Sequence, residues 1–111
     1  MKTIREFAPS DRYRYDFGLC SSKNGFAQVD TSQDASYFGT WANPDRLMIV
    51  CYCEGDVIIQ TAENKSEFVN EIHNIKKWNT ENGHRFIGID PGFNEALAAK
   101  FCDLGLSDLL H

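Results

Sequence analysis

Hydrophobic side chains concentrate in the middle of the chain, over residues 47–62 (LMIVCYCEGDVIIQTA). β-branched residues, which pack well on a pleated sheet and are poor helix formers, are frequent in this segment. Two apolar runs flank residues 54–56 (EGD), whose composition is typical of a tight turn. The pattern predicts a β-hairpin. Because Ile49 and Val50 point to opposite faces of a strand and both are apolar, we expect this hairpin to be covered on both sides.

Three shorter segments upstream also have the alternating polarity of strands. The Asn24-Gly25 pair tolerates positive φ angles and predicts a hairpin turn between the first two segments. A polar loop over residues 31–36 follows the second segment, and Pro44 ends the third because proline has no N–H for a sheet ladder. Residues 1–10 precede these strands as an N-terminal lead-in. The three predicted strands cover residues 12–19, 26–31 and 37–42.

The longest amphipathic pattern predicts a helix over residues 64–79. Asn64 and Glu67 have the spacing of a capping box, which satisfies amide groups at a helix N-terminus. Apolar residues then recur every three or four positions, so one side of the helix is expected to pack on the sheet. This apolar stripe consists of Phe68, Ile72 and Ile75, flanked by Val69 and Trp78.

A short strand and a second helix follow the first helix. The strand is predicted over residues 85–89. We expect Asp90 to cap the second helix, with Pro91 at its first position, where proline is well tolerated. Residues 106–111 are expected to return to the core as a C-terminal tail. The apolar face predicted for the second helix consists of Phe93, Leu97 and Phe101.

The order of these elements predicts an α+β fold. We expect an antiparallel β-meander of five to six strands with two helices packed on one face. The helix between the fifth and sixth strands would also permit one parallel crossover. A chain of 111 residues is long enough to bury its own core, so residues 1–111 are assigned to a single globular domain.

Composition narrows the class of function. A hydrophobic fraction of 42% is typical of a folded chain, and the net charge of −5 disfavours nucleic acid as a partner. The same charge suits docking on a basic protein surface. No apolar run approaches the roughly 20 residues of a membrane span, and the N-terminus has no apolar region of a signal peptide. We therefore expect a cytoplasmic protein whose four cysteines are thiols.

The sequence contains no recognisable catalytic or metal-binding motif. Cys51 and Cys53 lack the Cys-x-x-Cys spacing of zinc sites, and no histidine is linked by spacing to a thiol or hydroxyl. Residues 88–92 (GIDPG) resemble the first strand of RNase H-like nucleases. That chemistry needs further carboxylates from later elements around two metal ions, and only residues 93–111 follow. We therefore interpret GIDPG as a strand end followed by a helix cap, and expect no catalytic residue, metal or cofactor.

The most unusual stretch is residues 34–44 (DASYFGTWANP), which is short, aromatic and bounded by turns. If its strand lies at a sheet edge, its aromatic side chains would be rigid anchors of the kind that dominate protein interfaces. The alternative is that they belong to the core. With neighbouring acidic residues, the candidate partner-binding set is Asp34, Tyr37, Phe38, Trp41, Glu54 and Asp56.

Residues 33–44 (QDASYFGTWANP) and 52–56 (YCEGD) are similar to small uncharacterised open reading frames of bacteria, their phages and plasmids. The similarity extends over most of the chain. It implies a class of small, acidic, single-domain accessory proteins of mobile elements. Such proteins often occupy a surface of a larger host machine, and anti-CRISPR proteins are one such group.

Three functional hypotheses follow. The first is a non-enzymatic binding protein that inhibits a host protein or complex by occlusion. The second is a small enzyme or ligand-binding domain, with a pocket between sheet and helices that uses Cys20 or Cys51 together with His73 and nearby acids. The third is a self-assembling structural protein, such as a homodimer, in which a second copy covers the apolar hairpin.

Overall fold

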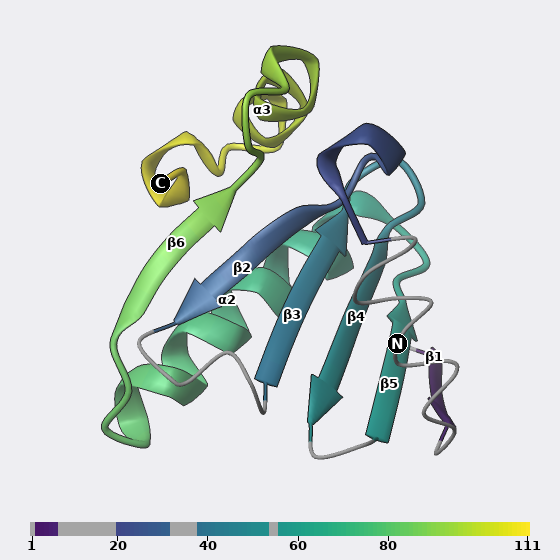
Figure 1. Cartoon of the computed structure of the whole chain (residues 1–111), viewed down its shortest axis with the longest axis vertical. Helices are drawn as coiled ribbons and strands as arrows, with labels where there is room; N and C mark the ends of the chain where they lie inside the picture. Colours follow the sequence, from purple (N-terminus) through teal and green to yellow (C-terminus); the bar gives the residue numbers. More distant parts are fainter. Residues whose placement is uncertain (1, 7–19, 32–37, 54–55) are drawn as a thin grey trace.

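The computed structural model describes residues 2–6, 20–31, 38–53 and 56–111. In these residues, one sheet combines with two helices, α2 (Lys65–Glu81) and α3 (Glu95–Asp103), and two short 3-10 turns, η2 (Ser22–Asn24) and η3 (Ser107–Leu109) (Figure 1). The predicted α+β class is confirmed. The strands are β1 (Lys2–Glu6), β2 (Ala27–Thr31), β3 (Phe38–Asn43), β4 (Met48–Cys53), β5 (Asp56–Thr61) and β6 (Phe86–Asp90).

The sheet has the strand order β1-β5-β4-β3-β2-β6, and all neighbours are antiparallel. Strands β2 to β5 form the predicted meander. Helix α2 crosses behind the sheet from β5 to β6 (Figure 1). There β6 pairs antiparallel with β2, so the parallel crossover that the sequence permitted is not formed.

The N-terminal segment differs from its prediction. Residues 1–10 were expected to be a lead-in, but β1 pairs with β5 from Lys2 opposite Thr61 to Glu6 opposite Val57. Pairing satisfies the backbone N–H and C=O groups that an uncovered edge of β5 would present to solvent. The predicted strand over residues 12–19 and residues 32–36 of the predicted loop lie outside the described residues, whereas Thr31, the first residue of that loop, ends β2.

The central hairpin is confirmed by β4 and β5, which lie side by side within the sheet. Ile49 and Val50 have relative exposures of 2% and 0%, and they belong to different hydrophobic clusters. Consecutive residues of a strand point to opposite faces, so the two clusters lie on opposite sides of the sheet. The prediction of a hairpin covered on both sides is therefore confirmed at these positions.

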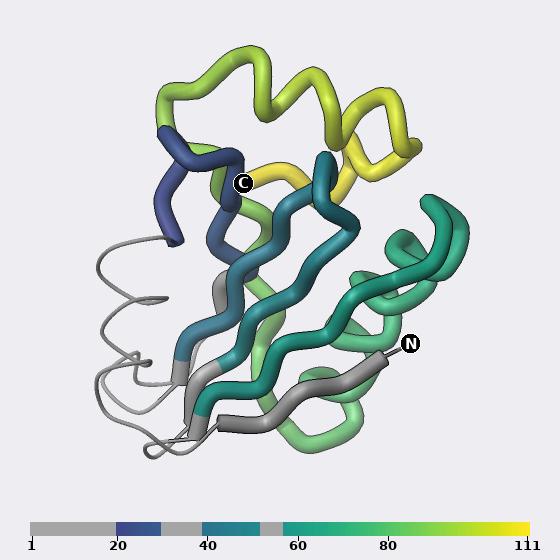
Figure 2. The backbone as a smooth tube through the Cα atoms, turned by 90° about the vertical axis from the view of Figure 1, so that its right-hand side faces the viewer, coloured from purple at the N-terminus to yellow at the C-terminus, as the bar shows by residue number. Residues whose placement is uncertain are grey.

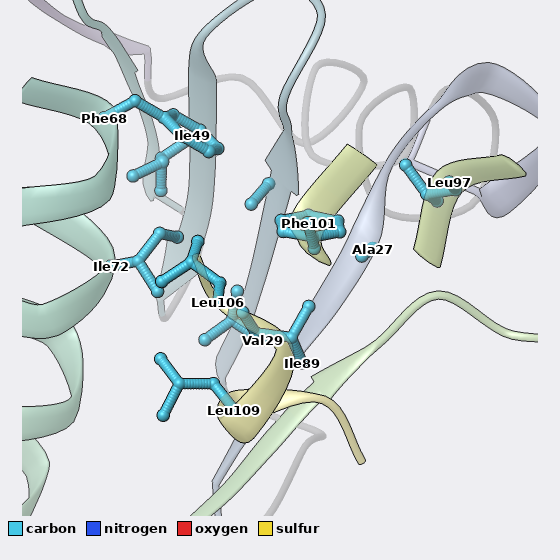
Figure 3. Close-up of a cluster of buried hydrophobic side chains, with 11 residues drawn as sticks. Ala27, Val29, Ile49, Phe68, Ile72, Ile89, Leu97, Phe101, Leu106 and Leu109 are labelled. Carbon is cyan, nitrogen blue, oxygen red and sulfur yellow. The ribbon is translucent and has the colours of Figure 1, made fainter. Parts of the chain in front are cut away.

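The larger cluster lies between the sheet and the helices. Helix α2 lies along one side of the sheet, and α3 lies across one end of it (Figure 2). Phe68 and Ile72 of α2 meet sheet residues such as Ile49, and Phe101 of α3 joins them (Figure 3). Each buried aliphatic or aromatic side chain contributes roughly 1.5–3 kcal/mol relative to exposure. The cluster contains Ala27, Val29, Ala42, Ile49, Phe68, Ile72, Ile89, Leu97, Phe101, Leu106 and Leu109.

The smaller cluster lies on the face away from the helices. Aromatic side chains contribute to its cover, as expected, through Phe26 and the half-buried Trp41. The chain itself thus buries both faces of the hairpin at these positions, without the second copy that the self-assembly hypothesis invoked. The cluster consists of Cys20, Phe26, Val50, Val57 and Ile59, with Trp41 and Met48 packed against it.

Both helices begin with an asparagine cap, and the sequence predicted the cap of α2 only. Asn64 accepts a hydrogen bond from the backbone N–H of Glu67 at 2.9 Å, as predicted for α2. Helix α3 begins at Glu95 rather than near Asp90, because Asn94 is its cap and accepts from the N–H of Leu97 at 3.0 Å.

Two aromatic residues placed on the apolar helix faces by the sequence are instead exposed. Phe93 precedes the α3 cap, so it lies outside the helix and has a relative exposure of 106%. Trp78 has a relative exposure of 57% and stacks on His84, with ring centroids 6.0 Å apart. Both positions were predicted from spacing alone, which does not fix the rotation of a helix end.

The C-terminal tail covers the outer edge of β6. Leu106 and Leu109 are buried, and the His111 N–H donates to the Ile89 carbonyl at 2.8 Å, which confirms the predicted return to the core. Gly88 makes this approach possible. Its φ is +146°, and a Cβ atom at this position would lie 2.7 Å from the His111 Cβ and 2.8 Å from the Leu109 carbonyl oxygen.

Gly88→Ala is expected to lower the free energy of unfolding by about 1–3 kcal/mol, because it combines backbone strain with a clash against the tail. Urea denaturation measures this change. Gly83→Ala is the matched control, since its φ is +78° but a Cβ atom there would meet nothing within 4 Å. Equal losses in the two variants would show that the close approach of the tail is not needed.

Candidate functional site

A cavity of ≈ 280 Å³ lies on the sheet face away from the helices. Gln28 projects to this face because its neighbours Ala27 and Val29 both point into the helix-side cluster. Gln28 is opposite Trp41 of β3 on one side and Asp90 of β6 on the other. Cross-strand partners share a face, so these three side chains form one row across the sheet. The cavity is lined by Cys20, Ser21, Ser22, Phe26, Gln28, Trp41, Asp90 and Gly92.

The wall of the cavity opposite this row is the segment that carries η2. The segment turns back on itself through Gly25, whose φ is +83°, and the Phe26 N–H donates to the Ser21 carbonyl at 3.0 Å. The Asn94 side chain donates to the Ser22 carbonyl at 2.8 Å, which ties η2 to the turn between β6 and α3. Two segments far apart in sequence are therefore held together around the cavity.

Asn43 also holds the η2 segment in place. Its side chain is buried, and its Oδ1 accepts from the backbone N–H groups of Asp45 and Arg46, both at 3.0 Å. Its Nδ2 donates to the Asn24 carbonyl at 3.2 Å. The sequence at this position predicts only the end of a strand. An asparagine before proline and aspartate is a turn signal, but its link to Asn24 depends on tertiary structure.

Asn43→Ala is expected to lower the free energy of unfolding by about 1–3 kcal/mol, because it removes a buried side chain together with its three hydrogen bonds to the backbone of Asn24, Asp45 and Arg46. The measurement is equilibrium denaturation in urea. Asn74→Ala is the control, since Asn74 is exposed on α2 and its amide lies 3.5 Å from the Glu71 carboxylate. If Asn43→Ala lowered the free energy of unfolding no more than Asn74→Ala does, the role of Asn43 in linking the β3–β4 turn to Asn24 would be contradicted.

The lining combines an exposed acidic residue with aromatic side chains. Asp90 is exposed, and its Oδ1 accepts from the Gly92 N–H at 2.8 Å in an Asx turn. No ion pair within the described part of the chain uses this carboxylate. Phe26 and Trp41 supply aromatic surface, and the Trp41 Nε1 is buried without a hydrogen-bond partner among the described residues. Hydroxyl, amide and thiol groups complete the lining.

Phe93 extends from the turn beside this cavity. It directly follows Gly92, which lines the cavity, and its other neighbour is the helix cap Asn94. The Asx turn at Asp90 and the Asn94–Ser22 hydrogen bond fix the backbone on both sides of Phe93. The result is an exposed aromatic side chain on a braced turn. Phe93 is apolar in the sequence, but its spacing from Leu97 and Phe101 also fitted a helix face.

Of the six predicted partner-binding residues, the structure describes the backbone of Phe38, Trp41 and Asp56. Asp34, Tyr37 and Glu54 lie outside the described residues. The backbone places Phe38 and Asp56 opposite Cys53 on either side of β4. Trp41 packs against the smaller cluster and lines the cavity, so it belongs in part to the core, which was the alternative interpretation.

The groups proposed for a catalytic pocket are also separated. Cys20 lies in the cluster away from the helices, whereas Cys51, two residues from Ile49, points to the helix side of β4. His73 is exposed on α2. The cavity therefore contains a thiol but neither Cys51 nor His73, and it lies on the opposite face from the predicted pocket. Among the described residues, no three His, Cys, Asp or Glu side chains are grouped as a metal site.

The chain was also compared with known proteins. No family model, curated protein or solved structure matches it. In the described ranges, neither helix has the length and hydropathy needed to cross a membrane. A function is therefore best inferred from the cavity and the braced turn beside it.

Proposed function

We propose that this protein is a non-enzymatic binding protein that occludes a surface of a larger host protein or complex, with Phe93 as its anchor. The observation that carries the proposal is the complete exposure of Phe93. Large aromatic side chains that insert into a partner's pocket often dominate the binding free energy of an interface. Burial of one phenylalanine contributes roughly 1.5–3 kcal/mol.

The braced turn strengthens this interpretation. An anchor on a flexible loop loses conformational entropy when it binds, whereas an anchor held in place beforehand loses less. The Asp90 carboxylate accepts from the Gly92 N–H, and the Asn94 side-chain oxygen accepts from the Leu97 N–H. These hydrogen bonds fix the backbone on both sides of Phe93. Trp78, the other large exposed apolar residue described, already has an intramolecular contact with His84.

Charge indicates the kind of partner surface. The net charge is −5, and the exposed acids Asp90 and Glu95 flank Phe93 in sequence. Complementary charge accelerates the encounter of two proteins and disfavours wrong partners. An apolar pocket surrounded by basic residues is therefore the surface that fits this turn best. A small acidic protein of a mobile element, the class implied by the resemblance of residues 33–44 and 52–56, would act in this way.

Phe93→Ala is expected to abolish recovery of a stoichiometric partner when the tagged protein is incubated with lysate of its host cells. Quantitative mass spectrometry compares the proteins retained by each variant. Trp78→Ala is the matched control, because it removes another exposed aromatic residue and is expected to retain the partner. Both variants should unfold at urea concentrations close to the wild type, since exposed side chains contribute little to the core.

Two outcomes would contradict the proposal. The first is that the wild-type protein recovers no stoichiometric partner. The second is that Phe93→Ala and the wild type recover the same partner in equal amounts, which would place the interface elsewhere on the surface.

A further inference from the structure

We infer that the cavity beside Phe93 receives the guanidinium group of an arginine side chain on the partner protein. This inference rests on the proposed function and assigns a second contact to the same interface. Gly92 lines the cavity and Phe93 follows it, so one partner surface can reach both. The partner would then present an arginine next to the apolar pocket that takes Phe93.

The charge of the cavity selects a cation. Asp90 is a lining residue, and no ion pair within the described part of the chain uses its carboxylate. Its Oδ1 accepts one backbone hydrogen bond, and an ionised carboxylate has further acceptor positions on both oxygens. Among the lining residues in the described part of the chain there is no lysine or arginine, so an anionic ligand such as phosphate would meet no opposite charge from them, only the like charge of Asp90.

The rest of the lining favours a guanidinium over an ammonium group. A guanidinium is planar, is weakly hydrated, stacks on aromatic rings and has five N–H donors. The half-buried Trp41 supplies aromatic surface, and Gln28, Ser21 and Ser22 supply oxygen acceptors in addition to Asp90. A lysine ammonium is compact and strongly hydrated, so it would use fewer of these groups.

The test uses a probe in place of the partner. N-acetyl-L-arginine N-methylamide is titrated into the Trp78→Phe protein, in which Trp41 is the sole tryptophan and reports on the cavity by fluorescence. We expect saturable binding with a Kd on the order of a millimolar, as for a single side chain. The corresponding citrulline amide, which has a similar shape without the charge, should bind at least about tenfold more weakly because it cannot form a charge-assisted hydrogen bond with Asp90.

Asp90→Asn should raise the Kd of the arginine probe by about tenfold or more, because it removes the charge-assisted contact. The amide oxygen of the introduced asparagine can still form the Asx turn. Asp103→Asn, at an exposed acid at the end of α3, is the control and should leave the Kd unchanged. Equal binding of the arginine and citrulline probes, an unchanged Kd for Asp90→Asn, or no saturable signal would overturn the inference.

Two further measurements distinguish a partner's arginine from free arginine, and failure of the arginine contact from failure of the proposed function. Free L-arginine that binds more tightly than the capped probe by tenfold or more would identify a site for a free amino acid and overturn the assignment to a partner side chain. The arginine probe, titrated in the absence of lysate, reports on the cavity alone. The titration needs no partner, so its failure removes only the arginine contact, whereas failure of the lysate experiment removes the proposed function.

Discussion

The structure depends on the burial of the β4–β5 hairpin on both faces. Ile49 and Val50 are consecutive residues, yet each is almost completely buried, in a different cluster. Helices α2 and α3 cover one face, and the segment with Cys20 and Phe26 contributes to the cover of the other. The cavity lies on this second face, where the η2 segment, β2, β3 and the end of β6 meet. The chain segments that cover the second face of the hairpin therefore also form the candidate site.

Asparagine side chains position that site. Asn43 joins the β3–β4 turn to Asn24, and Asn94 joins the start of α3 to Ser22. Each amide bridges segments that have no sheet contact with each other at that point, and each bond is partly buried. The turn that carries Phe93 is therefore held by the same hydrogen bonds that define one wall of the cavity.

Local patterns predicted the central hairpin, the cap of α2 at Asn64 and the C-terminal tail, because hydrophobic periodicity and capping depend on neighbours in sequence. They did not predict β1, because this five-residue strand is apparent only from its pairing with the edge of β5 in the folded structure. The start of α3 was misplaced because both Asp90 and Asn94 can cap a helix, and Asp90 is used in an Asx turn. The exposure of Phe93 follows from that choice and could not be read from spacing.

Hydrogen exchange of the native protein tests most directly whether the two-sided hairpin is the stable centre of the fold. Amides that open only when the whole chain unfolds exchange with the free energy measured by denaturation. The hydrogen-bonded amides of Ile49, Val50 and Cys51 in β4 should therefore exchange most slowly and match that value. Exchange at these positions as fast as in β1, or faster than in α2, would contradict the account.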